Sequence, residues 1–170
     1  RQDLTLLMML YGTAARIGEI LSIKVKHLHL DAPKPYVNLY GKGGKMRTAY
    51  LLPRVTSNVL GYLREFHGAK PYPDDFLFFS RVGGTKGKLT EPAIDKRIKK
   101  YAVSAHDKCK DVPLKAHAHQ FRHATASHWL EDGMNVVQVS FLLGHENLET
   151  TMRYLDITSE EKVNALATLE

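Results

Sequence analysis

The sequence of 170 residues contains a single cysteine, Cys109. One cysteine excludes an internal disulfide and a zinc site built on several thiolates, and it is typical of a protein kept reduced in the cytoplasm. No run of about 18 apolar residues occurs, so we expect no membrane-spanning helix and no membrane partner. The hydrophobic content of 44% and the charged content of 25% are ordinary for a globular protein with its own core.

Acidic residues are the minority among the charged side chains. The chain has 24 Lys and Arg against 18 Asp and Glu, which gives a formal net charge of +6. This balance favours a polyanionic partner, most simply nucleic acid. Because the chain begins at Arg1 and not at a methionine, we expect it to be a piece of a longer protein.

The hydrophobic pattern predicts a mostly α fold with a small antiparallel β-sheet, in the α+β class. Residues 36–40 and 47–52 alternate around the turn GKGG, which indicates a β-hairpin. A short buried strand or extended segment is expected at 76–80. Helices are expected over 4–11, 55–66, 119–132, 136–143, 147–154 and 158–169. Two more are expected to begin at about residue 15 and at Thr90, and Tyr101 is expected to face inward on the helix that begins at Thr90. The basic segment 81–88 is predicted to be a flexible loop, and 105–116 to be irregular.

The segment HAHQFRHATASH, residues 117–128, holds four of the nine histidines. His119 and His123 are four residues apart and share a helix face, as two metal ligands would. Zinc needs three or four ligands, however, and Arg122 would repel a metal there, so no metal site is predicted. His119 and Arg122 also project together, and the arginine fork matches two phosphate oxygens. The alternative is a solvated histidine beside a surface salt bridge.

Four segments in order resemble the tyrosine recombinases, the phage-integrase and Xer family. They are TAARIGEILSIKVKHL at 13–28, GKGGKMR at 41–47, HQFRHATASHWLEDG at 119–133 and LLGHENLETTMRYL at 142–155. The resemblance covers nearly the whole chain. It implies that residues 1–170 have the fold of the family's catalytic domain, with the N-terminal core-binding domain absent from this chain.

The resemblance carries over to individual positions. It implies six catalytic side chains: Arg16, Lys42, His119, Arg122, His145 and Tyr154. Glu19 matches the acidic residue that supports the first arginine. One departure is Ala14, which stands where the family usually has glycine, and this puts the local turn in question.

Each position also has a simpler interpretation. Arg16 and Glu19 form an i,i+3 pair that is common at helix starts. Lys45 is the alternative to Lys42 for the catalytic lysine. The alternative for Tyr154 is an aromatic residue of the core. His145 follows a helix-stopping glycine, and its alternative role is to bind the end of that helix. His123 and His128 are interpreted as packing and hydrogen-bonding residues, and His117 has no assigned role.

The resemblance implies a site-specific recombinase, or integrase, that joins Tyr154 to a DNA 3′-phosphate and then rejoins the strands. It implies no cofactor, a specific double-stranded DNA site, a homo-tetramer on DNA that is a monomer when free, and a cytoplasmic, nucleoid-associated protein. A type IB topoisomerase and a non-catalytic DNA-binding module are the alternatives. Further DNA contacts are expected from basic side chains outside the catalytic set: Lys45, Arg81, Lys86, Lys88, Lys96, Arg97, Lys99 and Lys100. The alternative for these is a solvated basic face.

Overall fold

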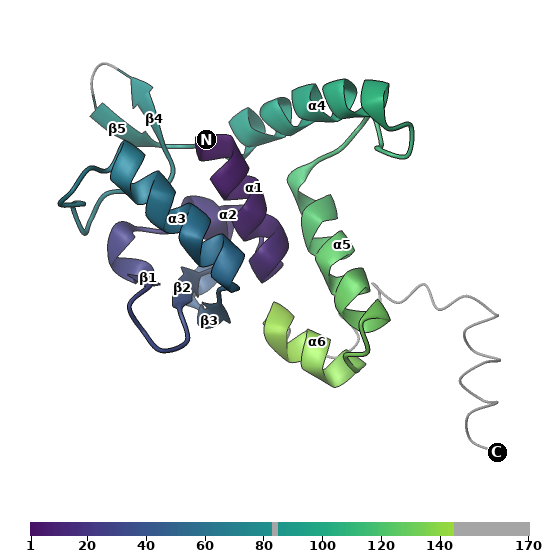
Figure 1. Ribbon diagram of the computed structural model, residues 1–170, viewed down its shortest axis with the longest axis horizontal. Coiled ribbons are helices and arrows are strands. Elements are labelled where there is room, and N and C mark those ends of the chain that lie inside the picture. Colours follow the sequence, from purple (N-terminus) through teal and green to yellow (C-terminus); the bar gives the residue numbers. More distant parts are fainter. Residues whose placement is uncertain (83–84, 145–170) are drawn as a thin grey trace. The chain divides into compact units, whose positions relative to one another are not determined.

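The computed structural model describes residues 1–82 and 85–144 (Figure 1). The chain divides into two compact units, Arg1–Thr125 and Ala126–Glu170. The helices expected over 147–154 and 158–169, and the site residues His145 and Tyr154, lie outside the described residues.

The fold is mostly α-helical with small antiparallel sheets, as the sequence predicts. Its α-helices are α1 Gln2–Thr13, α2 Ile17–Leu21, α3 Pro53–Phe66, α4 Glu91–Lys108, α5 Ala118–Glu131 and α6 Val136–Leu143. Its strands are β1 Leu28–His29, β2 Tyr36–Tyr40, β3 Met46–Tyr50, β4 Phe79–Val82 and β5 Thr85–Lys88, and the short turns Val25–His27 and Lys42–Gly44 are 3-10 helical. Strands β1, β2 and β3 form one sheet in that order, and β4 pairs with β5.

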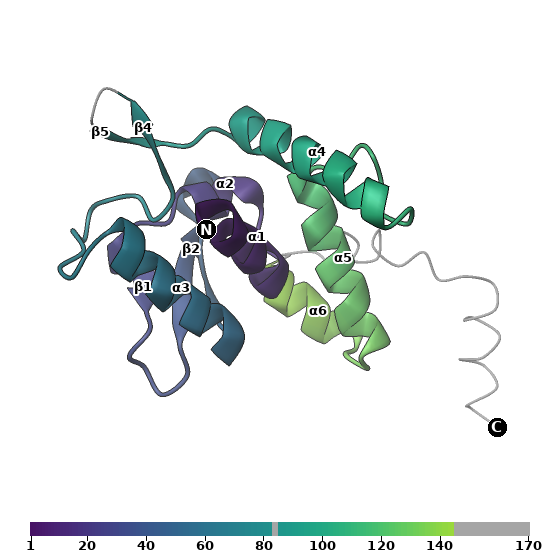
Figure 2. The ribbon, with the colours of Figure 1, turned by 45° about the horizontal axis from the view of Figure 1, so that its top comes forward.

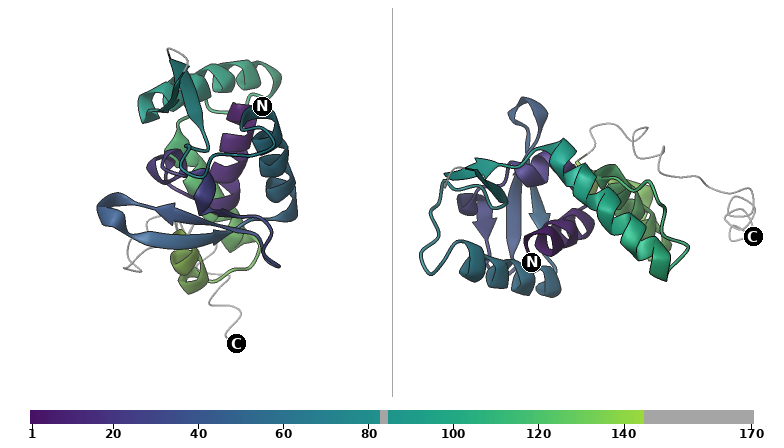
Figure 3. Two further views of the ribbon diagram at one scale, coloured as in Figure 1. Left: turned by 90° about the vertical axis from the view of Figure 1, so that its left-hand side faces the viewer. Right: turned by 90° about the horizontal axis from the view of Figure 1, so that it is seen from above.

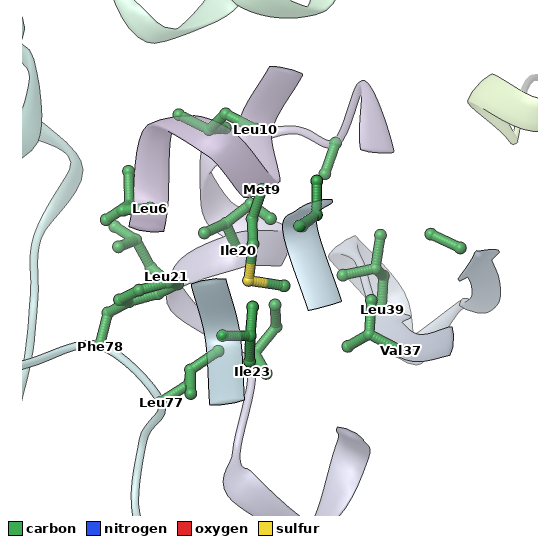
Figure 4. Close-up of a cluster of buried hydrophobic side chains, with 14 of the residues drawn as sticks. Leu6, Met9, Leu10, Ile20, Leu21, Ile23, Val37, Leu39, Leu77 and Phe78 are labelled. Carbon is green, nitrogen blue, oxygen red and sulfur yellow. The ribbon is translucent and has the colours of Figure 1, made fainter. Parts of the chain in front are cut away.

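The core of the first unit lies between the three-stranded sheet and the neighbouring helices α1 and α3 (Figures 2 and 3). Alternation along β2 turns Val37 and Leu39 inward, where both are fully buried. Met9 from α1 and Ile20 from α2 meet them in one apolar cluster (Figure 4). Burial of this apolar surface is the main force that fixes α2, and with it the start of the site, against the sheet.

The segment predicted to be a flexible basic loop, 81–88, is instead largely a β-hairpin. Arg81 pairs with Lys86 and Phe79 with Lys88 in an antiparallel register. The sequence places Gly-Gly between the two strands, and this dipeptide is typical of two-residue hairpin turns. The prediction is wrong because charged strands lack apolar alternation, and a β-hairpin exposes basic side chains to water as a loop does.

Helix α4 begins as predicted, with the Thr90 side chain accepting a hydrogen bond from the Ala93 N–H at 3.4 Å. It runs on to Lys108, so the first part of the segment predicted to be irregular is helical. Tyr101 does not face inward: its side chain is 45% exposed and its hydroxyl donates to Asp3 on α1. A tyrosine can cover a helix with its ring while its polar tip stays in water.

The ends of α5 and α6 confirm the glycine stops read from the sequence. Gly133 and Gly144 have φ of 98° and 71°, the left-handed conformation that ends helices. Asn135 caps α6 through Gln138, with reciprocal bonds of 2.9 and 3.0 Å. Within the described part of the chain, no helix is long and apolar enough to cross a membrane.

Candidate functional site

Helix α1 ends at Ala14, the position where the resemblance leads one to expect glycine. Ala14 is fully buried and has φ 51° and ψ 27°, a left-handed conformation that glycine adopts without steric cost. The carbonyl oxygen of Ala14 accepts a hydrogen bond from Nη1 of Arg122 at 2.6 Å. Alanine therefore makes the turn, at a cost of about 1–2 kcal/mol for the left-handed conformation.

Helix α5 is held to the end of α1 by two side-chain bonds. Besides the Arg122 bond, the Thr125 hydroxyl lies 2.7 Å from the Tyr11 carbonyl oxygen. The last carbonyls of a helix have no partner within the helix, so they are available to such donors. Arg122 is only 1% exposed, which makes it one of the largest fully buried side chains of the described chain.

Arg16 and Glu19 lie at the start of α2, directly after this turn. Glu19 reaches back to the first turn, where its Oε2 accepts the Arg16 backbone N–H at 2.8 Å. This is half of a capping box, and it satisfies a donor that the helix leaves open. The Arg16 guanidinium itself is 53% exposed, and its Nη1 lies 3.9 Å from Glu19 Oε1.

Arg47 on β3 makes the closest side-chain ion pair with Glu19, and the sequence reasoning missed it. Its Nε lies 3.2 Å from Oε1 and its Nη2 lies 3.0 Å from Oε2, a side-on pair. A signal was present, because alternation puts Arg47 on the same strand face as the buried Ala49. A charged residue on that face requires a buried counter-charge, and Glu19 supplies it.

The charge of Glu19 is stabilised by the cations around it. Burial by itself raises the pKa of this carboxyl, but the hydrogen bonds and the charge of Arg47 lower it. The backbone N–H of Arg16 and the charge of Arg122 add to them, so the pKa lies below its ordinary value. The carboxylate is therefore ionised at neutral pH.

His119 lies in the first turn of α5 on the exposed side of this cluster. Partial burial lowers its pKa most, and the charges of Arg122, His117, His123 and Arg16 lower it further. The imidazole is therefore neutral at pH 7 and able to accept a proton. The bond from Arg122 to the Ala14 carbonyl, two residues before Arg16, brings α5 beside the start of α2. His123, and His128 further along α5, are exposed. Their interpretation as packing and hydrogen-bonding residues stays a prediction.

The β2–β3 hairpin brings its turn to Glu19. A side-chain carbon placed on Gly41 would lie 3.5 Å from Glu19 Oε1, and the Gly41 N–H donates to the Lys45 carbonyl at 2.8 Å. Lys42 and Lys45 both lie exposed on this turn. The preference for Lys42 stays a prediction.

Apart from Lys45 on the β2–β3 turn, the basic side chains expected to contact DNA fall into two groups. Lys86 and Arg81 lie over the ring of Phe79, with Lys86 also 2.8 Å from Asp75. Lys88 and Lys24 lie in the same way over the ring of Phe76. On α4 the lysines expected to contact DNA, Lys96, Lys99 and Lys100, are all exposed.

Arg97 differs from the other basic side chains of α4. It is half-buried and paired with Asp3 at 2.8 Å, so it joins α4 to α1.

The first unit thus brings together Arg16, Glu19, His119 and Arg122, with the turn that carries Lys42 beside Glu19. Two arginines and a neutral histidine around one point can bind a phosphate and accept a proton. Among residues 1–82 and 85–144 no group of three potential metal ligands gathers.

The family model described as the phage integrase family matches residues 1–161. The fold and the grouped arginines and histidine fit this class of DNA-processing proteins. The chain belongs to the phage integrase family.

Two curated relatives carry names that agree with this family. The tyrosine recombinase XerA of Pyrococcus horikoshii is 30% identical over 97% of this chain and 54% of its own length. The tyrosine recombinase XerC of Chlamydia caviae is 32% identical over 95% of this chain and 49% of its own length. The chain therefore spans about half the length of the curated relatives it matches.

Solved structures share the fold. The crystal structure of XerA recombinase superposes with a TM-score of 0.78 at 19% identity, over 99% of this chain and 57% of that one. XerH site-specific recombinase, in a structure bound to its difH substrate, gives a TM-score of 0.75 at 23% identity, over 99% of this chain and 46% of that one. At these identities the likeness concerns the fold.

Proposed function

We propose that this chain is the catalytic part of a site-specific DNA recombinase that cuts and rejoins DNA through Tyr154. The observation that carries the proposal is the grouping of Arg16, His119 and Arg122 from two distant segments around one point. Membership of the phage integrase family and the DNA-bound XerH structure support it. The proposal includes an N-terminal core-binding domain that is not part of this chain.

In the proposed reaction the phenol oxygen of Tyr154 attacks the scissile phosphorus. The phosphorus–tyrosine bond forms, the bond to the 5′-oxygen breaks, and the DNA keeps a 3′-phosphotyrosyl link. Arg16 and Arg122 stabilise the charge on the non-bridging oxygens, which is typically the largest contribution to such catalysis. His145 adds a hydrogen bond to these oxygens.

Two proton transfers complete the step. His119 accepts the phenol proton, for which its lowered pKa suits it, and Lys42 gives a proton to the leaving 5′-oxygen. A 5′-hydroxyl from a second duplex reverses the chemistry and reseals the strand. The phosphotyrosyl link conserves the bond energy, so the cycle needs no metal, cofactor or nucleotide.

The assembly is part of the proposal as well. We infer a homo-tetramer on two DNA sites and a monomer in the absence of DNA, acting in the cytoplasm at the nucleoid. The basic hairpin β4–β5 and the lysines of α4 contribute phosphate contacts, as their net positive charge favours.

A suicide duplex tests the proposal. The full-length protein first selects its site from random duplexes, and that site is then nicked beside the scissile phosphate so that the cleaved strand diffuses away. We expect a covalent protein–DNA adduct that Tyr154→Phe abolishes. Binding without an adduct would instead indicate a DNA-binding module, and relaxation of supercoiled DNA without strand exchange would indicate a topoisomerase.

A further inference from the structure

Arg47 and Arg16 share one carboxylate, that of Glu19, and they use it unequally. Arg47 takes both oxygens with its guanidinium, at 3.2 and 3.0 Å. Arg16 is bound mainly through its backbone N–H, at 2.8 Å from Oε2. The Arg16 guanidinium lies 3.9 Å from Oε1 and remains half-exposed.

We propose that Arg47 is a positioning residue that binds both oxygens of the Glu19 carboxylate and so keeps the Arg16 guanidinium available for a DNA phosphate. This inference rests on the proposed function. Arg47 itself is mostly buried, with 15% of its side chain exposed, so it acts on the phosphate only through Glu19 and Arg16.

The argument follows from the capacity of a buried carboxylate. It offers about four acceptor positions, and Arg47 with the Arg16 backbone fills three of them. Without Arg47, Glu19 would still be an ionised group buried beside Arg16. A buried charge takes the nearest counter-charge, so the Arg16 guanidinium would turn from solvent toward Glu19.

The charges around Glu19 support the same conclusion. Three cations lie near it: Arg16 at the start of its own helix, Arg47 on β3 and Arg122 on α5. Three positive charges and one negative charge leave an excess for a phosphate. Removing Arg47 lowers this excess and also removes the partner that holds Glu19 away from Arg16.

The sheet register explains why Arg47 is suited to this role. It lies opposite Leu39 on β2, which is fully buried, one residue inside the hairpin. The core thus fixes the strand that carries Arg47. A rigid support is what a positioning residue requires.

The experiment uses the full-length protein and the selected suicide duplex at saturating concentration. The variants are Arg47→Gln, Arg47→Lys and the double variant Arg47→Gln/Glu19→Gln. Arg64→Gln, on the exposed side of α3, is the matched control. DNA affinity and the rate of adduct formation are measured separately, at a temperature where melting curves show every variant folded.

We expect Arg47→Gln to form adduct about 10- to 100-fold more slowly, with DNA affinity within about threefold of the parent. This is less than the roughly 100- to 1000-fold for loss of a direct charge-stabilising donor, because Arg47 acts only through Arg16. The rate of adduct formation by Arg47→Lys should lie between those of the parent and Arg47→Gln, because lysine keeps the charge but cannot make the side-on pair. The double variant should be faster than Arg47→Gln by about fivefold or more, since a neutral glutamine at 19 does not capture Arg16. A role in folding alone predicts no such recovery in the rate of the folded protein.

Parental rates in Arg47→Gln, or a double variant no faster than Arg47→Gln, would overturn the inference. If Arg47→Gln does not fold, a parental rate in the Arg47→Lys variant overturns it equally. Absence of a Tyr154-dependent adduct in the parent protein refutes the proposed function instead, so the two failures are distinguishable.

Discussion

Replacing Glu19 by glutamine tests the buried ion pair at the centre of the site. The side chain is 5% exposed and receives two hydrogen bonds from Arg47. Glutamine keeps the shape, but one of its terminal atoms becomes an NH₂ donor that faces a guanidinium, which only donates. Breaking a buried pair costs roughly 3–5 kcal/mol. Since glutamine retains one acceptor oxygen, we expect the lower end, about 3 kcal/mol.

The assay is urea unfolding of the 170-residue chain at pH 7, with thermal unfolding beside it. For a chain of this size, 1 kcal/mol shifts the melting temperature by about 2–4 °C, so the expected loss is roughly 6–12 °C. The control is Glu65→Gln. Glu65 pairs with Arg1 at 2.8 Å, but both side chains are about half-exposed, so its loss should stay below about 1 kcal/mol.

The pH dependence sharpens the test. The folded pKa of Glu19 lies below its ordinary value of 4.5, so its ionised form contributes stability above pH 4.5. That contribution is lost as pH falls through the folded pKa. The gap in stability between the parent and Glu19→Gln should therefore narrow below pH 4.5. Equal losses in Glu19→Gln and Glu65→Gln at pH 7, or a gap that does not narrow in acid, would refute the reasoning.

Three further outcomes are expected. Because the pKa of His119 is lowered, adduct formation at subsaturating DNA should hold its rate as pH falls to 6.5 and decline only below that value; a decline that begins above pH 6.5 contradicts the assignment. Tyr62→Phe removes a buried hydroxyl 2.7 Å from the Leu77 carbonyl oxygen and should lower the free energy of unfolding by about 1–2 kcal/mol in urea, whereas an unchanged midpoint would show that the bond contributes nothing. Replacing Arg81 and Lys86 together by glutamine should reduce the slope of log affinity against log salt by about 1–2, and a slope equal to the parent's would remove β4–β5 from the DNA interface.

Much of the fold could be predicted from local patterns. The hairpin β2–β3 follows from alternation around GKGG, and the capped start of α4 follows from Thr90 and Pro92. The glycine stops of α5 and α6 lie where the sequence puts them. Such signals depend on residues a few positions apart, so the sequence suffices. The β4–β5 hairpin was missed because charged strands give no hydrophobic alternation to detect.

In the candidate site, too, some features follow from the sequence and others depend on the tertiary structure. The sequence alone was enough to identify the family and the positions of Arg16, His119 and Arg122, because these follow from the order and spacing of the motifs. Only the tertiary structure decided that Arg47 binds Glu19 across 28 positions, and that Arg122 binds the carbonyl of Ala14 across 108. These contacts depend on strand register and on a left-handed turn, which the packing of the core fixes. A local pattern cannot encode a partner that the folded chain brings from so far away.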